Sequence, residues 1–276
     1  MQPILILATL GLGLLAATYS HAAENPEQII QRSVAANEAD WKEAPRYACM
    51  VEDETDDRGT KTYEEMMILG SPYERLVAIN GKPLSASEQR KEEEKFQQML
   101  AKRQNETQEQ RQDRIAKYEK ERKRDHILMQ QLTKAFNFRL RGEQKLGNRD
   151  VYVLDATPKP GYKPPNMEAK VLTGMKGELW IDKNEFQWVK VEAETFRPVS
   201  ISGFLARVDP GTRFELEKAP VAPGVWLPKH FEMESHAKIV FLFHEDKSES
   251  ETYSNCHIQG SIGKEEALAR QYPLLR

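Results

Sequence analysis

The clearest secondary-structure pattern in this chain is GELWIDKNEFQWVKVEAET, residues Gly177–Thr195. Its first half alternates the apolar Leu179 and Ile181 with other residue types, and alternation resumes after Lys183-Asn184-Glu185. A period of two residues gives a β-strand one apolar face and one polar face. Among the connecting residues, Asn184 most readily adopts a left-handed conformation. We therefore predict a β-hairpin that turns at Asn184 and seeds an antiparallel sheet.

Similar alternating runs flank this hairpin on both sides. Turn sequences such as Asn80-Gly81 and Asp209-Pro210-Gly211 separate them, and together they predict about ten strands. A helix precedes these strands, because Asn25 can cap it and Pro26 suits the first helical position. The predicted fold class is α+β: a strongly curved antiparallel sheet, or half-barrel, of about ten strands packed on helices.

A long charged segment, residues 85–135, interrupts the strands. Ser85-Ala86-Ser87-Glu88 is a capping box, and neither glycine nor proline follows it until Gly142. The middle of the segment is almost entirely polar, so one continuous helix there would stand largely in water. We prefer a helical hairpin that bends near Gln104-Asn105-Glu106-Thr107. A single long helix is the alternative.

The amino-terminal residues predict export. Ile4–Ala17 is an apolar run of signal-peptide length that is too short to cross a bilayer. Ser20-His21-Ala22 offers small residues at the positions that a signal peptidase reads. We predict a signal peptide over residues 1–22 and one domain over residues 23–276, and an uncleaved amino-terminal anchor is the alternative. The mature chain is expected in the periplasm without a transmembrane span, with secretion as the alternative.

Charge and cysteine content narrow the classes of partner and site. The formal net charge of 276 residues is −3, which favours neither nucleic acid nor a strongly acidic partner. The two cysteines, Cys49 and Cys256, each lie in a strand-like run and lack the spacing of a zinc site. In an oxidising compartment they form either a disulfide or two free thiols. The sequence leaves both states open.

The sequence contains no G-x-S-x-G, H-E-x-x-H or G-x-x-x-x-G-K motif. We therefore predict a protein that is not an enzyme and needs no cofactor. His230 and His236 share one face of a predicted strand with two glutamates between them. Six residues of extended chain span about 20 Å, too far for one metal ion to bind both. We interpret this polar row as the solvent side of its strand and predict no metal site.

Apolar residues on the concave side of the predicted sheet form the candidate ligand site. If the helices cover that side incompletely, these residues line a cavity suited to acyl chains, and methionines help because they adapt to irregular ligands. If the helices cover it completely, the same residues are ordinary core. The candidates are Met66, Ile68, Leu179, Ile181, Val189, Val191, Phe214, Leu216, Phe231, Met233, Phe241 and Phe243.

Two hairpin motifs are similar to those of a known family. They are Gly177, Leu179, Trp180, Ile181 and Asp182 with Val189-Lys190-Val191-Glu192, and Asp209-Pro210-Gly211-Thr212 with Gly224-Val225-Trp226-Leu227-Pro228. With an exported helix, a strand meander and an inserted helical segment, they resemble the outer-membrane lipoprotein-sorting (LolA/LolB-like) proteins. The resemblance implies a periplasmic half-barrel closed by helices around an apolar cavity. It also implies a carrier of acylated lipoproteins, the role of the family's characterised members.

The long charged insertion departs from the short connection that this family usually has. We therefore carry two expectations for function. The first is a non-enzymatic periplasmic protein that binds a lipid or the acyl chain of a lipoprotein. The second is an envelope adaptor that binds a protein partner through the insertion, in which case the apolar face is filled core.

Overall fold

The computed structural model describes residues 25–55, 59–200, 206–239 and 243–259. The helices are α1 Pro26–Glu43, η1 Ala44–Arg46, α2 Ala86–Gln104, α3 Gln108–Ala135 and η2 Glu168–Gly174. The strands are β1 Tyr47–Thr55, β2 Gly59–Ile68, β3 Ser71–Ile79, β4 Lys82–Pro83, β5 Phe136–Leu146, β6 Arg149–Pro158, β7 Met175–Asp182, β8 Trp188–Thr195, β9 Val199–Ser200, β10 Ala206–Val208, β11 Arg213–Ala222, β12 Val225–Ile239 and β13 Phe243–Ile258. The predicted signal peptide lies outside the described residues.

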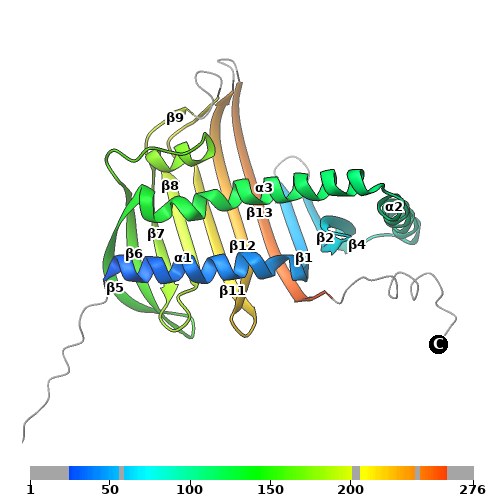
Figure 1. Cartoon of the computed structure of the whole chain (residues 1–276), viewed down its shortest axis with the longest axis horizontal. Coiled ribbons are helices and arrows are strands. Elements are labelled where there is room, and N and C mark those ends of the chain that lie inside the picture. Colours follow the sequence, from blue (N-terminus) through cyan, green and yellow to red (C-terminus); the bar gives the residue numbers. More distant parts are fainter. Residues whose placement is uncertain (1–24, 56–58, 201–205, 240–242, 260–276) are drawn as a thin grey trace, which may run out of the picture.

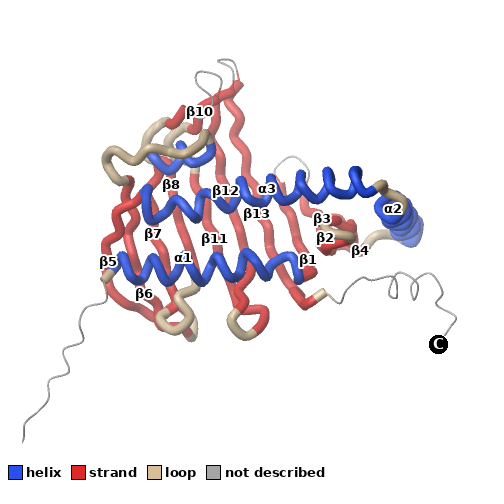
Figure 2. Tube along the Cα trace, viewed as in Figure 1, coloured by secondary structure: helices blue, strands red, loops and turns tan. Residues whose placement is uncertain are grey.

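The strands form one antiparallel sheet in the order β4-β3-β2-β1-β13-β12-β11-β8-β7-β6-β5. β10 pairs with β12 and with β9 beside this path. The sheet stays open, and α1 and α3 both cross one of its faces (Figures 1 and 2). We call this helix-covered side the inner face and the other side the outer face. An open antiparallel sheet packed on helices confirms the predicted α+β class. Within the described ranges, no helix is both long enough and apolar enough to cross a bilayer.

The main hydrophobic core lies between the inner face and the two helices. Ile29 and Ile30 of α1 are buried there, and Leu128 and Leu132 of α3 pack against it. The sheet contributes buried residues from β5 to β8, including Leu154, Leu179 and Ile181. Burial of this apolar surface is the main force that holds the helices on the sheet.

The central hairpin forms, but its turn differs from the prediction. The left-handed residue is Phe186, with φ 58°, and not Asn184. The Asp182 carboxylate accepts hydrogen bonds from the amides of Asn184 and Glu185 at 2.9 and 2.8 Å, which moves the reversal toward Phe186. The Phe186 ring is buried, and the Arg32 guanidinium lies 3.4 Å from its centroid.

A bulge in this hairpin also changes which residues face inward. Trp180 pairs with Lys190, whereas Ile181 pairs with Trp188, so Val189 has no residue of β7 directly opposite it. Because paired residues share a face, Trp188 joins the inner core. The placement of Val189 in the inner row beside Val191 stays a prediction.

The charged insertion consists of two helices, α2 and α3, separated at the preferred bend by residues 105–107, and we call this pair the helical hairpin. The predicted capping box is present, since the Ser85 side chain accepts from the Glu88 amide and Glu88 bonds back. Thr107 and Gln110 form a second capping box at the start of α3. These caps satisfy backbone donors that a helix start otherwise leaves unpaired.

The two helices of the insertion lie on opposite faces of the sheet edge. Phe96 and Leu100 of α2 pack with Met66 and Ile68 of β2 in a second core cluster. Glu65, the neighbour of Met66, is close enough to Tyr118 of α3 to influence its ionisation. Neighbouring residues of a strand face opposite sides. The hairpin therefore straddles the β2–β3 edge, with α2 on the outer face.

This arrangement corrects two of the candidate lining residues. Leu179 begins a row of directly paired residues that crosses the inner face from strand to strand. The row continues through Val191, Leu216, Phe231, Glu251 and Asp53. On β2, the residue opposite Asp53 is Lys61, so strand alternation places Glu65 on the same inner face. Met66 and Ile68 therefore point to the outer face, where α2 covers them, and they do not join the inner row. Strand alternation predicts two faces but does not tell which helix covers each.

Cys49 and Cys256 are joined by a disulfide with an S–S distance of 2.02 Å. The bond connects β1 to β13, the neighbouring strands through which β1–β4 join the rest of the sheet. Of the two states that the sequence left open, the structure therefore contains the disulfide.

Candidate functional site

The inner apolar row runs from a fully covered part to a partly covered part. Leu179, Ile181 and Val191 are buried in the main core. Phe214 and Leu216 of β11 are half-buried at its margin. The next strand, β12, places Phe231 opposite Leu216 and Met233 opposite Phe214, and both are half-buried. We call Phe214, Leu216, Phe231 and Met233 the apolar patch.

The two remaining candidates fall at the limit of the described residues. Phe241 lies outside them, and Phe243 begins β13 without a described side chain. The structure therefore brings five of the candidates into the inner row on β7, β8 and β11 and two more on β12. It places Met66 and Ile68 elsewhere.

The inner face changes character at β13. Glu251 lies opposite Phe231, and Glu249 lies opposite Met233. The strand register places three more acids, on β1, β2 and β3, on the same face. We call the whole set the inner carboxyl band, and it consists of Glu249, Glu251, Asp53, Glu65 and Glu74. We expected apolar residues across the whole concave side. The structure has them on one part of the inner face only, and the inner carboxyl band lies next to that part.

Burial shapes the ionisation of this band. Desolvation raises the pKa of Glu65, and the neighbouring charges of Glu74 and Glu251 raise it further. Desolvation also raises the pKa of Glu251, although a hydrogen bond from the Tyr253 hydroxyl opposes this. Burial keeps the pKa of Tyr253 far above its ordinary value, so its hydroxyl stays a donor.

The two inner helices are fastened to each other beside this face. His126 of α3 is buried and lies 2.5 Å from the Glu38 carboxylate of α1. The His126 ring stacks on Trp41 at 4.2 Å, and Arg122 lies 4.0 Å from the centroid of the same indole. The hydrogen bond with His126 lowers the pKa of Glu38. α1 and α3 therefore cover the sheet as one unit.

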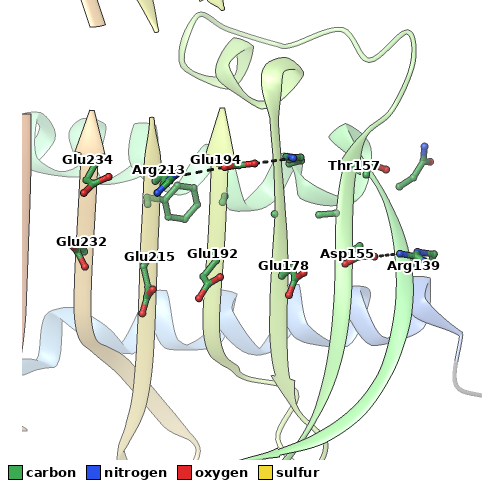
Figure 3. A pocket seen from close by; sticks show the side chains of 16 residues that line it. Arg139, Asp155, Thr157, Glu178, Glu192, Glu194, Arg213, Glu215, Glu232 and Glu234 are labelled. Atoms are coloured by element: carbon green, nitrogen blue, oxygen red, sulfur yellow. Dashed lines mark hydrogen bonds and ion pairs between the residues drawn. The ribbon is translucent and has the colours of Figure 1, made fainter. Parts of the chain in front are cut away.

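A hollow of 770 Å³ lies on the outer face, on the side away from α1 and α3 (Figure 3). Two rows of charged side chains line it, and directly paired acids recur along one row: Glu178, Glu192, Glu215 and Glu232. Cations partly balance them, since Lys190 lies 2.7 Å from Glu192 and 2.9 Å from Glu215. In the described part of the chain, no group of three or more His, Cys, Asp or Glu residues is placed to hold a metal ion.

The chemistry of the two faces therefore differs. Exposed ion pairs like those of the outer hollow contribute little stability and suit water better than hydrocarbon. Glu232 and Glu234, from the polar row considered for metal, line this hollow and so lie on the outer face. The apolar patch on the inner face is the place where a hydrocarbon ligand is chemically suited.

Comparison with known proteins finds likeness in structure alone. No family model matches the sequence, and no curated protein matches it. A domain described as an outer membrane lipoprotein-sorting protein, from Vibrio parahaemolyticus, matches with a TM-score of 0.37 and 12% identity over 88% of this chain and 97% of that one. A DUF1329 family protein from Desulfovibrio piger matches with a TM-score of 0.33 and 10% identity over 87% and 96%.

A LolA superfamily protein from Nitrosomonas europaea matches with a TM-score of 0.31 and 13% identity over 91% of this chain and 100% of that one.

Sequence reasoning missed the inner carboxyl band and the buried histidine. Glu249 and Glu251 alternate in SESETY, and Glu65 sits in a run of polar residues, so both segments look solvent-facing. Only the strand register brings these acids together on the face that α3 covers. A single sequence does not contain that register.

Proposed function

We propose that this protein is a non-enzymatic periplasmic carrier that holds the acyl chain of a lipid or lipoprotein against the apolar patch. The observation that carries the proposal is the incomplete cover of Phe214, Leu216, Phe231 and Met233. In the row of Leu216 and Phe231, by contrast, the neighbours Val191 on β8 and Leu179 on β7 are buried in the main core. Contiguous apolar side chains that stay partly accessible on a helix-covered face are typical of a binding groove.

The composition of the patch suits a hydrocarbon chain. Two phenylalanines, a leucine and a methionine provide broad apolar contact, and the methionine adapts to different chain shapes. Each methylene that leaves water for such a surface contributes about 0.8 kcal/mol of binding free energy. The resemblance of the hairpin motifs to lipoprotein-sorting proteins supports the same ligand class.

Two methionines provide a matched test of the site. Met233 and Met50 are both half-buried on strands of this sheet, but Met50 pairs with Glu64 and so faces the outer side. Met233→Gln places a polar amide in the patch, whereas Met50→Gln makes the same change on the other face. We expect Met233→Gln to weaken binding of a fluorescent long-chain fatty acid about tenfold, because burying an unpaired amide costs about 1–3 kcal/mol.

Met50→Gln should leave that affinity within about twofold of the parent, since a change of 1.4 kcal/mol corresponds to tenfold. Equal losses in both variants would mean that stability, and not the patch, controls binding. Retained binding in Met233→Gln would place the ligand elsewhere or remove the proposal.

An envelope adaptor is the second candidate, and the rigid attachment of the helical hairpin favours it. α2 presents exposed charged side chains, such as Arg90, Lys91 and Glu94, from a helix whose other side is buried on the sheet. Removing residues 85–135 would not test this role cleanly, because α3 contributes Leu128 and Leu132 to the main core. Reversing the three exposed charges is the suitable change. An adaptor predicts loss of a specific cross-link to an envelope protein with acyl binding intact.

A further inference from the structure

Five carboxylates share the inner face on strands β13, β1, β2 and β3, beneath α3. Asp53 lies directly opposite Glu251, and Glu65 lies directly opposite Glu74. Like charges at directly opposite positions of a sheet destabilise it. Glu74 is exposed, whereas the other four are half-buried, so most of the band is shielded from the water that would screen this repulsion.

The band is also poorly compensated. The Oδ1 atom of Asp53 is buried and accepts no hydrogen bond. The Tyr253 hydroxyl donates to Glu251. Lys61 lies opposite Asp53 at the margin of the band. Arg122, a cation of α3, is engaged with Trp41 of α1.

From the helix side, Tyr118 of α3 faces the band. Burial raises the pKa of Tyr118, and the charge of Glu65 adds to the effect. The group that α3 presents to the acids is thus the Tyr118 phenol, which stays neutral at physiological pH. From the same helix, Glu119 raises the pKa of this phenol and Arg122 lowers it. A neutral phenol packs better against a protonated carboxyl than against a carboxylate, because a buried anion loses hydration.

We propose that the inner carboxyl band is a proton-sensitive lock between α3 and the β13–β1–β2 part of the sheet. Protonation of Glu65 and Glu251 tightens this packing, and their ionisation loosens it. The apolar patch lies directly beside the band, since Phe231 pairs with Glu251. The lock therefore controls how firmly the helical cover next to the patch is held, but it acts in the ligand-free protein and does not depend on acyl binding.

The direction of the pH dependence follows from the two glutamates. Their pKa values are raised in the folded protein, so the folded state binds protons more readily than the unfolded chain. The stability that they contribute is fully present below the ordinary glutamate pKa of about 4.3. It is lost as the pH rises through their folded values. The lock is thus tight in acid and loosens as the pH rises.

Glutamine tests this inference because it imitates the protonated acid. Glu65→Gln and Glu251→Gln remove the charge and keep the shape, and Glu64→Gln is the matched control because Glu64 is half-buried on the outer face. At a pH of about 8, each inner variant should raise Tm by about 2–4 °C. At a pH of about 5, the gain should shrink, because a larger fraction of the parent glutamates is then protonated than at a pH of about 8. Glu64→Gln should show no such gain at either pH.

Hydrogen exchange locates the effect. Compared with the parent at one pH of about 8, where intrinsic exchange rates are equal, the inner variants should exchange more slowly in β1, β2, β13 and the first half of α3. A lower Tm for both inner variants at that pH, or a gain equal to that of Glu64→Gln, would overturn the lock. A Tm gain that is the same at both pH values would also overturn it. Loss of acyl binding with the lock intact would instead count against the proposed function alone.

Discussion

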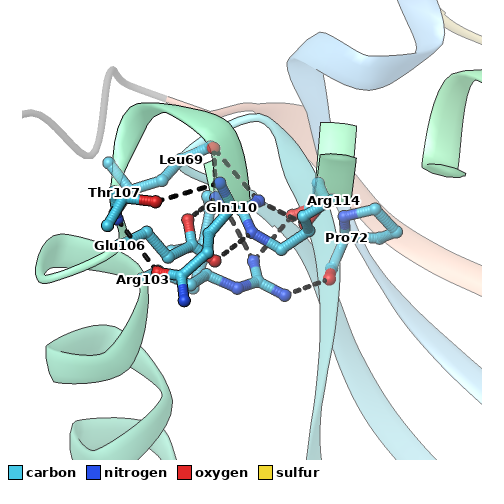
Figure 4. Close-up of polar contacts among 9 residues, drawn as sticks. Leu69, Pro72, Arg103, Glu106, Thr107, Gln110 and Arg114 are labelled. Carbon is cyan, nitrogen blue, oxygen red and sulfur yellow. Dashed lines mark hydrogen bonds and ion pairs between the residues drawn. The ribbon is translucent and has the colours of Figure 1, made fainter. Parts of the chain in front are cut away.

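Arg103 of α2 and Arg114 of α3 hold the same β-turn from two sides (Figure 4). Arg103 donates to the carbonyls of Ile68, Ser71 and Pro72 at 2.7–2.9 Å. Arg114 donates to the Leu69 carbonyl at 3.2 Å and bonds Glu106 in the loop between the helices. The two guanidiniums thus replace the water that would otherwise satisfy these carbonyls. They fix the helical hairpin across the sheet edge.

Replacement of Arg103 by methionine should release this edge. Arg103→Met keeps most of the apolar stem but removes three charge-assisted hydrogen bonds. We expect the free energy of unfolding in urea to fall by about 2–3 kcal/mol, because buried carbonyls lose their partners. Lys102→Met is the control, since Lys102 is exposed and should change that energy by less than about 0.5 kcal/mol. Equal effects would show that the turn does not need Arg103.

Gly70 in the same turn should tolerate alanine less well than Gly81. Both have positive φ, +93° and +69°, so alanine at either site costs about 1–2 kcal/mol of backbone strain. At Gly70 a new Cβ would also lie 2.8 Å from Cδ1 of Ile115 on α3, whereas nothing lies within 4 Å at Gly81. Gly70→Ala should therefore lower Tm more. Ile115→Val should cost less in the Gly70→Ala background than alone, and additive effects would contradict the contact.

A buried ion pair joins α1 to strand β11 and should be costly to break. Lys218 of β11 lies 2.6 Å from Asp40 and 2.7 Å from Asn37, and Asp40 also accepts from the Trp226 amide. Lys218→Met leaves a buried, unpaired carboxylate, so we expect about 3–5 kcal/mol less stability in chemical denaturation. Lys229→Met, at the exposed pair with Glu217, should cost about 1 kcal/mol or less. Similar losses would mean that burial of the first pair has no effect.

The disulfide should contribute through the unfolded chain. It links residues 207 positions apart, and closing so long a loop is worth up to about 4–5 kcal/mol. Cys49→Ser with Cys256→Ser should lower Tm and make it independent of reductant, whereas the parent should fall to the same Tm when reduced. A parent Tm that ignores reductant, while the serine variant is less stable, would point to packing of the sulfurs and not to the bond.

Local chemistry was predictable from the sequence wherever one short segment contains its own cause. Asn25 caps α1 with Pro26 in its first turn, and Ser85 with Glu88 caps α2, as expected. The bend between α2 and α3 falls at residues 105–107 because Thr107 starts a new helix with its own capping box. The α+β class followed from strand alternation on both sides of a helical segment.

Features that depend on distant partners were not predictable. The bulge that leaves Val189 without a partner on β7 and brings Trp188 into the core is a property of the pairing between β7 and β8. The outward direction of Met66 depends on α2, which folds back onto a face that strand alternation alone leaves unassigned. His126 directly follows a run of charged residues in the sequence, and only contact with Glu38 and Trp41 of α1 buries it.

The most direct test of the acyl-carrier account is native mass spectrometry of the mature protein purified from its own envelope, followed by organic extraction. The account predicts a co-purifying lipid or acylated peptide that is present in Met50→Gln and depleted in Met233→Gln. A clean apo mass for the parent, with no lipid taken up on titration, would contradict it. The apolar patch would then be part of the core, and the charged helical hairpin would become the place to look for a partner.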